Sequence, residues 1–229
     1  MRTLTAVGHR GDPYRFRENT LDSLRSAFAR GADAVEIDVR LTRDGVPVLL
    51  HDDTLERLWG HDVRLDAVTA PQLRELAEGR IPTLREALAA AGAGRVMIDL
   101  PGATAESVRT VVDVVRECGA RERTFYSAGP ATMLAVRAAD PGAEIALTWT
   151  TLSPPRRVLI DAVAPAWLNY RFGLVDRELV DALHADGLRV SAWTADTRWS
   201  VRRLLAAGVD SITTNRIDVL TAERARAGQ

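Results

Sequence analysis

Acidic side chains fall at the ends of apolar runs in the first hundred residues of this chain. Glu36 and Asp38 are two residues apart in one run, so on a strand both point to the same face. Asp99 ends a later run. Crowded carboxylates repel each other unless a cation joins them, and oxygen ligands suit the hard ions Mg²⁺ and Ca²⁺. We expect these three acids to hold one divalent metal ion; the alternative is a buried acid pair bonded to backbone or arginine.

Two histidines end apolar runs on either side of this acid pair. His9 closes the first run, and His51 closes the run that follows the pair. Two histidines beside a metal can act as general base and general acid on a phosphodiester. The alternative is that each histidine caps a loop. His61 and His184 have no such neighbours in the sequence, and we expect both to be ordinary surface residues.

Three further residues adjoin these positions and have two interpretations each. Arg10 follows His9, where a guanidinium would bind a phosphate oxygen or else form a surface salt bridge. Asp52 follows His51 and either orients a histidine ring or serves as a turn residue. Trp193 ends an apolar run and either walls a substrate pocket or packs in the core.

Glu18 and Asn19 precede the first helical pattern. Asn19, with Asp22 three residues later, is an adequate helix N-cap, so its structural interpretation is at least as strong as a functional one. Glu18 lies just before that cap. We expect Glu18, Asn19 and Asp52 to support the residues that touch substrate rather than to touch it themselves.

Composition narrows the class of protein. The 229 residues are 46% hydrophobic, which is enough for a substantial core, and no linker-like stretch divides them, so we expect one domain over 1–229. The net charge is −1 with both signs scattered, which argues against a nucleic-acid partner. Every basic residue is arginine, and a chain without lysine cannot form a Schiff base through a side-chain amine.

The remaining composition favours an intracellular enzyme. Cys118 is the single cysteine, so it forms no intramolecular disulfide, and we expect it to be buried and inert. The first residues run into a strand too short for the apolar part of a signal peptide. No apolar run approaches the ~18 residues of a membrane span. We therefore expect a cytoplasmic protein.

Helical patterns, glycines and apolar runs alternate along the whole chain, which predicts parallel strands joined by helical crossovers. Six residues separate the second run from the third and include the turn signal Asp44-Gly45, so the third run should form an antiparallel hairpin. The other eight runs predict a (β/α)8 barrel with an irregular excursion at 52–82 that contains one short helix, 71–77. The nine predicted strands are 4–9, 34–39, 46–51, 96–100, 124–127, 144–148, 163–169, 188–193 and 210–214.

These motifs together resemble the glycerophosphodiester phosphodiesterase family over nearly the whole chain. His9-Arg10-Gly11, followed by Glu18-Asn19-Thr20, is similar to that family's first signature. The stretch from Gly31 through Glu36-Ile37-Asp38 to His51-Asp52 is similar to its second. Later resemblances are Ile81-Pro82-Thr83-Leu84, Trp193-Thr194 and the stretch from Gly208 to Thr214.

The resemblance implies a barrel that holds its metal at Glu36, Asp38 and the acid of the third barrel strand. It also implies acid–base roles for His9 and His51 and a phosphate contact for Arg10. The products would be sn-glycerol 3-phosphate and an alcohol. The chain departs from the family at Asp99-Leu100-Pro101, where glutamate, a branched residue and lysine are usual, and at Arg17, which replaces a proline.

Three hypotheses follow for function. The first is a metal-dependent phosphodiesterase acting on small glycerophosphodiesters. The second keeps this chemistry but acts on lysophospholipids, for which Leu58-Trp59 hints at an apolar rim. The third is a phosphate-ligand binding homologue with impaired catalysis, supported by Pro101 at the position of the family's lysine.

Overall fold

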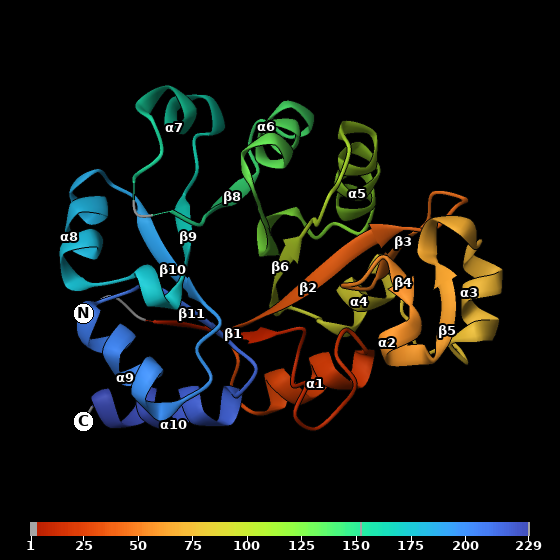
Figure 1. The fold of residues 1–229 in the computed structure, drawn as a ribbon, viewed down its shortest axis with the longest axis horizontal. Helices are drawn as coiled ribbons and strands as arrows, with labels where there is room; N and C mark the ends of the chain where they lie inside the picture. The colour runs from red at the N-terminus through yellow and green to blue at the C-terminus, as the bar shows by residue number, and fades with distance from the viewer. Residues whose placement is uncertain (1–3, 152, 229) are drawn as a thin grey trace.

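The computed structural model describes residues 4–151 and 153–228. In this part of the chain eight parallel strands form a closed ring, because β1 pairs with both β2 and β11 (Figure 1). This closed ring confirms the predicted (β/α)8 barrel, a TIM barrel. Its strands are β1 (Thr5–His9), β2 (Ala34–Leu41), β6 (Arg95–Asp99), β7 (Thr124–Ala128), β8 (Glu144–Trp149), β9 (Trp167–Arg171), β10 (Arg189–Trp193) and β11 (Ser211–Thr214).

Helices alternate with the barrel strands and surround them (Figure 1). In α5, Val108, Val111, Val112 and Val115 are buried at helical spacing, and Thr104 caps the first turn. Short 3₁₀ helices η2 (Arg121–Arg123) and η3 (Phe172–Leu174) adjoin β7 and β9. The surrounding helices are α1 (Leu21–Ala29), α4 (Leu84–Ala90), α5 (Ala105–Glu117), α6 (Pro130–Ala139), α7 (Arg157–Val163), α8 (Arg177–Ala185), α9 (Arg198–Ala207) and α10 (Ile217–Ala227).

The predicted hairpin is also present. Strand β3 (Pro47–Leu49) pairs antiparallel with the outer end of β2, with Val39 opposite Leu49. Gly45 takes a positive φ of 78° in the connecting turn, a conformation that glycine adopts without strain. The hairpin extends β2 beyond the barrel rim.

One predicted strand begins in the wrong place. The apolar run at 163–169 suggested a strand from residue 163, but Val163 is the last residue of α7. Ala164 then ends the helix in the left-handed conformation, with φ 47°, and β9 begins at Trp167. A buried helix end and a buried strand are equally apolar, so composition alone did not separate them.

The excursion after the hairpin is more ordered than predicted. It contains a two-stranded antiparallel sheet and, as predicted, a helix near 71–77. Its apolar side chains, among them Leu50, Leu55, Leu65 and Leu73, form a small core separate from the main one. The description of 52–82 as irregular was therefore wrong. Its elements are β4 (Thr54–Leu55), α2 (Glu56–Trp59), β5 (His61–Arg64), η1 (Leu65–Ala67) and α3 (Ala70–Leu76).

The amino-terminal end of the barrel is closed by a network around Glu144, the first residue of β8. One carboxylate oxygen accepts hydrogen bonds from Trp167 Nε1 at 2.7 Å and Arg189 Nη2 at 2.8 Å. The other accepts from Arg95 Nη2 at 2.6 Å. Arg189 lies over the Trp167 ring and Arg95 over the Phe125 ring, so both cations also contact aromatic faces.

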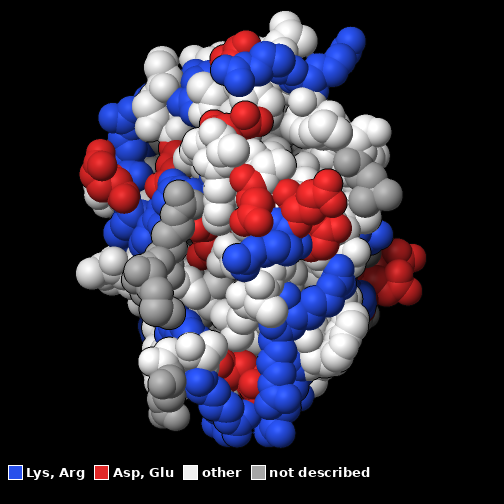
Figure 2. Space-filling view, turned by 90° about the vertical axis from the view of Figure 1, so that its left-hand side faces the viewer, with Lys and Arg blue, Asp and Glu red and all other residues white. Residues whose placement is uncertain are grey.

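On the face of the molecule seen in Figure 2, acidic and basic side chains lie next to one another. Within residues 4–151 and 153–228, no helix has the length and apolar character needed to cross a membrane.

Candidate active site

A cavity of about 310 Å³ opens at the carboxyl-terminal end of the barrel. His9, Asp99 and Trp193 line it, and each is the last residue of its strand. Glu36 and Asp38 also line it, because alternation along β2 turns both inward while Val35 and Ile37 enter the core. We call this space the acid-lined cavity. Barrel enzymes place their chemistry at this end of the strands.

The acid-lined cavity contains three carboxylates close together. One oxygen each from Glu36, Asp38 and Asp99 lies within 4.8 Å of the others. The pairing of β2 with β6 explains this, because Asp38 lies directly opposite Asp99. Burial, and then the charges of Asp38 and Asp99, raise the pKa of Glu36 well above its usual value. Burial, and then the charge of Asp38, raise the pKa of Asp99 to about 7.

Protein groups offset only part of this negative charge. The Arg10 backbone N–H donates to Glu36 Oε2 at 2.9 Å, and Arg10 Nε forms an ion pair with Asp38 Oδ2 at 3.0 Å. Burial and the mutual repulsion of the acids raise the pKa values of Glu36 and Asp99 despite these contacts, as expected for carboxylates that are only partly compensated. A set of three convergent oxygen donors with this charge fits a hard divalent cation.

Asn19 also holds Asp38, which corrects its interpretation as a helix cap. Its Nδ2 donates to Asp38 Oδ2 at 2.8 Å, and its Oδ1 accepts from the Asp38 backbone N–H at 3.2 Å. The cap of α1 is Thr20, whose side chain accepts from the Ser23 backbone N–H. Asn19 and Thr20 are neighbouring residues that could each cap the helix. Thr20 caps α1, and Asn19 binds Asp38 in the site.

A tight loop brings Arg10 to the acids. Arg10 and Asn19 both have positive φ, 54° and 56°, and the Asn19 backbone N–H donates to the Arg10 carbonyl at 3.0 Å. At Gly11, with φ 88°, a Cβ atom would lie 2.4 Å from Ser23 Oγ. Only glycine allows the loop to approach α1 this closely.

His9 is held by a residue that the sequence did not indicate. Its Nδ1 contacts Asn215 Oδ1 at 2.7 Å, while Asn215 Nδ2 donates to Asp196 Oδ2 at 2.8 Å. Because the amide oxygen faces the ring, Nδ1 carries the proton and Nε2 keeps a free lone pair. That Nε2 lies 3.8 Å from Glu36 Oε2. Burial, and then the charge of Arg10, lower the pKa of His9, which favours the neutral ring.

His51 is oriented from the other side of the cavity. Its Nδ1 lies 2.7 Å from Asp52 Oδ1, the neighbour proposed from sequence to orient a ring. Arg57 of α2 donates from Nε to Asp52 Oδ2 at 2.5 Å. Burial by itself would raise the pKa of Asp52. The hydrogen bonds with Arg57 and His51 outweigh burial and lower the pKa of Asp52 below its usual value. This carboxylate is therefore charged at neutral pH.

Arg57 also connects the histidine side of the cavity to the arginine side. Its Nη2 donates to Glu18 Oε1 at 2.6 Å, and the same oxygen accepts from Arg10 Nη1 at 2.9 Å. Burial by itself would raise the pKa of Glu18, but the contacts with Arg57 and Arg10 outweigh it and lower this pKa. The result is a chain of alternating charges from Asp52 to Asp38. Sequence reasoning missed Arg57, because a single arginine in a four-residue helix carries no pattern.

The far wall of the acid-lined cavity is polar. Trp193 Nε1, Asn169 Oδ1 and Thr213 Oγ1 are buried, and none has a hydrogen-bond partner within the described residues. Trp193 thus lies on the wall of the cavity, with Arg171 over its ring. Asn169 and Thr213 were not singled out from the sequence, since single polar residues inside strands give no distinct signal.

Three other residues lie away from this cavity. His184 was expected on the surface, but its side chain is 21% exposed and Nε2 contacts Asp210 Oδ2 at 2.7 Å. His61 Nε2 contacts the Leu76 carbonyl in the excursion at 3.1 Å. Cys118 is half-buried rather than buried.

A closed parallel barrel with three acids and two histidines at its carboxyl-terminal mouth has the layout of a barrel enzyme, whose active site lies at this end of the strands. The chain belongs to the glycerophosphoryl diester phosphodiesterase family, whose model matches residues 9–219. It is accordingly a phosphoric diester hydrolase.

Individual relatives agree with this assignment. A probable glycerophosphodiester phosphodiesterase 2 of Mycobacterium tuberculosis is 32% identical, over 94% of this chain and 88% of the relative. A glycerophosphodiester phosphodiesterase of Caldanaerobacter subterraneus is 27% identical, over 96% of this chain and 97% of the relative. An Oleispira antarctica phosphodiesterase solved with its product sn-glycerol-3-phosphate shares the fold, with 23% identity, a TM-score of 0.89 and 96% of each chain covered.

Proposed function

We propose that the protein hydrolyses glycerophosphodiesters to sn-glycerol 3-phosphate and an alcohol. The observation that carries this proposal is the set of three convergent carboxylates between two oriented histidines in one cavity. Family membership and the product bound in the Oleispira antarctica relative support it. The buried, unpaired polar atoms of Trp193, Asn169 and Thr213 suit the hydroxyl groups of a glycerol moiety.

Glu36, Asp38 and Asp99 would hold one Mg²⁺ or Ca²⁺ ion. When bound, such an ion supplies positive charge to a phosphate oxygen. Arg10, already fixed by Glu18 and Asp38, would contact a second phosphate oxygen. Because Asp38 and Glu18 also hold Arg10, the phosphate position is set before substrate enters.

The two histidines would divide the proton transfers. Neutral His9, with its free lone pair at Nε2, takes a proton from water or from the substrate's own glycerol hydroxyl. His51, held at Nδ1 by charged Asp52, donates a proton from Nε2 to the departing alcohol. The leaving group then departs as an alcohol and not as an alkoxide.

The test is alcohol release from glycerophosphocholine with Mg²⁺, with Ca²⁺ and with a chelator, next to a His9→Ala control. We expect metal-dependent turnover that the variant lacks. Turnover that survives both the chelator and the His9→Ala change would refute the proposed mechanism. No turnover of any glycerophosphodiester would refute the proposed substrate.

A second candidate substrate is a lysophospholipid. Leu58 and Trp59, the sequence hint for an apolar rim, are half-buried, and Arg17 covers the Trp59 ring. Tyr14 and Phe16 favour this candidate instead, because they are 66% and 42% exposed in the loop that follows Arg10. Lysophosphatidylcholine tested beside glycerophosphocholine distinguishes the two, and a Phe16→Ser change should weaken only turnover of the lipid.

A further inference from the structure

Arg40 stands out among the cations near the acid cluster because none of the acids that the structure describes forms an ion pair with it. Its Nε donates to the neutral His51 carbonyl at 2.8 Å. Within residues 4–151 and 153–228, neither Nη1 nor Nη2 of Arg40 has a hydrogen bond or an ion pair. Arg10 and Arg57, in contrast, each contact two carboxylates. Arg40 therefore presents uncompensated positive charge.

The position of Arg40 is determined by the strand that carries the acids. Glu36, Asp38 and Arg40 alternate along β2, so all three lie on its inward face, with Arg40 outermost at the rim. Asp38 lies opposite Asp99, the last residue of β6, and Arg40 lines the same cavity as Pro101, two residues beyond Asp99. The charge of Arg40 reaches the acid cluster, because it is among the influences that lower the pKa of Asp99.

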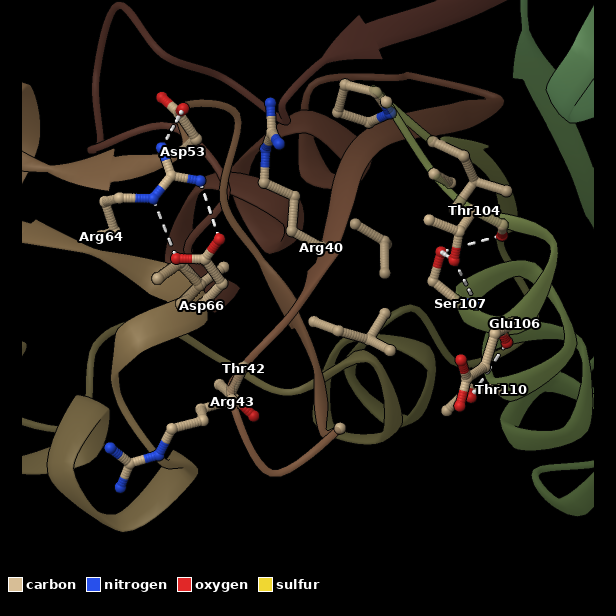
Figure 3. Close-up of a pocket in the computed structure, with 18 residues that line it drawn as sticks. Arg40, Thr42, Arg43, Asp53, Arg64, Asp66, Thr104, Glu106, Ser107 and Thr110 are labelled. Atoms are coloured by element: carbon tan, nitrogen blue, oxygen red, sulfur yellow. Dashed lines mark hydrogen bonds and ion pairs between the residues drawn. The ribbon is translucent and has the colours of Figure 1, made fainter.

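A second cavity, of about 440 Å³, lies between the β2–β3 hairpin and the start of α5, and Arg40 lines it (Figure 3). We call it the side cavity. It borders the acid-lined cavity along Leu100, Pro101 and Gly102, which line both. Figure 3 shows Arg40 standing apart from the ion pairs that Arg64 forms with Asp53 and Asp66. Among the described residues the Nη atoms of Arg40 thus lack a partner, and they belong to the cavity that adjoins the acid-lined one.

We propose that Arg40 is a second phosphate-binding residue, whose Nη atoms donate to an anionic oxygen of the diester from the β2 side of the mouth. The inference rests on the proposed function, which supplies the phosphate as the anion. A diester phosphate carries one negative charge and has two non-bridging oxygens, and a planar guanidinium suits that geometry. Pro101, which lines the same cavity as Arg40, offers neither a charge nor a backbone N–H.

The test compares an anionic ligand with a neutral one, so that lost charge is separated from lost structure. Arg40→Gln removes the charge, and Arg40→Lys keeps it while losing the Nε bond to His51. Arg43→Gln is the matched control, because Arg43 lines the same side cavity but bonds the Ala67 carbonyl and Gln72. Binding of inorganic phosphate in Mg²⁺ is measured by calorimetry, and inhibition by phosphate and by glycerol is measured in the glycerophosphocholine assay.

We expect Arg40→Gln to weaken phosphate binding roughly 10- to 100-fold, the usual effect of losing one charge-assisted hydrogen bond. Inhibition by glycerol should stay within about twofold, and Arg40→Lys should recover most of the phosphate affinity. Arg43→Gln should change neither phosphate binding nor inhibition by glycerol. Equal losses for phosphate and glycerol, or no loss for phosphate, would overturn the proposal.

Calorimetry also separates this inference from the proposed function. Phosphate binding that depends on Arg40, in a protein that cleaves no glycerophosphodiester, would support the inference and refute the proposed substrate. If Arg40→Gln turns over glycerophosphocholine with unchanged KM and kcat, the proposed substrate is supported and the inference about Arg40 is refuted.

Discussion

Acids at the two ends of the barrel differ in how fully protein groups compensate their charge. At the amino-terminal end, Glu144 receives hydrogen bonds from two arginines and a tryptophan, so both its oxygens are satisfied. At the carboxyl-terminal end, Glu36 and Asp99 have raised pKa values because they are buried beside Asp38. Satisfied charge stabilises the fold, whereas carboxylate charge left without full compensation favours the binding of a cation. We therefore expect acids to serve stability at one end and chemistry at the other.

Replacing an acid at the mouth should give the largest effect on activity. Glu36→Gln removes one expected metal ligand while an amide oxygen can still accept from the Arg10 backbone N–H. We expect glycerophosphocholine turnover to fall on the order of a thousandfold. In chelator, the variant should gain about 1 kcal/mol, or about 2–4 °C in Tm, because repulsion within the cluster decreases. If Glu36→Gln loses both activity and stability, the acids at the mouth are needed for the fold, which contradicts the contrast between the two ends of the barrel.

The support of His51 should have the next largest effect. Asp52→Asn keeps the shape of the side chain but removes the charge that faces Nδ1. We expect kcat to fall about 10- to 100-fold with little change in KM, as is usual for residues that orient a reacting group. Steady-state kinetics over a pH series measures this. An unchanged kcat would show that the His51–Asp52 contact is irrelevant to turnover.

Arg57 tests whether the excursion belongs to the active end of the molecule. Arg57→Gln breaks its contacts with both Glu18 and Asp52, and we expect kcat/KM to fall about tenfold. Arg64→Gln is a matched control, because Arg64 forms similar ion pairs in the same excursion away from the histidine. If both variants lose activity equally, the excursion acts through its stability alone.

The raised pKa of Asp99 should also change how the free energy of unfolding depends on pH. In the folded state the pKa of Asp99 is about 7, above its usual 3.8, so between these values the folded protein binds more protons than the unfolded one. Stability of the metal-free protein should therefore fall as pH rises from about 4 to 7. Urea midpoints of wild type and Asp99→Asn, compared across pH 5 to 8 in chelator, isolate this contribution. Equal slopes would contradict the raised pKa.

Replacing the acid at the opposite end should have the smallest effect on activity. Glu144→Gln leaves Arg95 and Arg189 without a carboxylate, and we expect unfolding to become easier by about 1–3 kcal/mol. Turnover at 25 °C should stay within about threefold, since Glu144 lies at the far end of the barrel. Urea unfolding and the glycerophosphocholine assay measure the two quantities. A large loss of kcat would remove the distinction between the two ends.

Much of this architecture could be predicted because it depends on spacing. Alternation placed Glu36 and Asp38 on one face, and the short connection through Asp44-Gly45 required an antiparallel hairpin. The excursion was harder, because its small core is assembled from short elements without a clear period. Spacing within a segment is visible in sequence, but contact between short segments is not.

Two supporting residues of the site, Asn215 and Arg57, escaped prediction for a similar reason, although Glu18, Asn19 and Asp52 were expected to have supporting roles. Asn215 reaches His9 across 206 positions, and Arg57 reaches Glu18 across 39. Asn19 carried a local helix-cap signal that was stronger than its long-range role. Arg40 follows Asp38 by two residues on β2, and nothing in the sequence singled it out. Only the structure shows that its Nη atoms lack a partner among the described residues.

The closure of the barrel through β1 has a consequence for protein synthesis. Strand β1 carries His9, and it pairs with β11, the last barrel strand that the ribosome makes. Until β11 and Asn215 emerge, β1 has an open edge and His9 lacks the amide that orients its ring. A nascent chain that lacks β11 would therefore carry most of the residues of the site without the amide that orients His9. We expect such a chain to show no turnover until β11 and Asn215 have been made and have packed against β1.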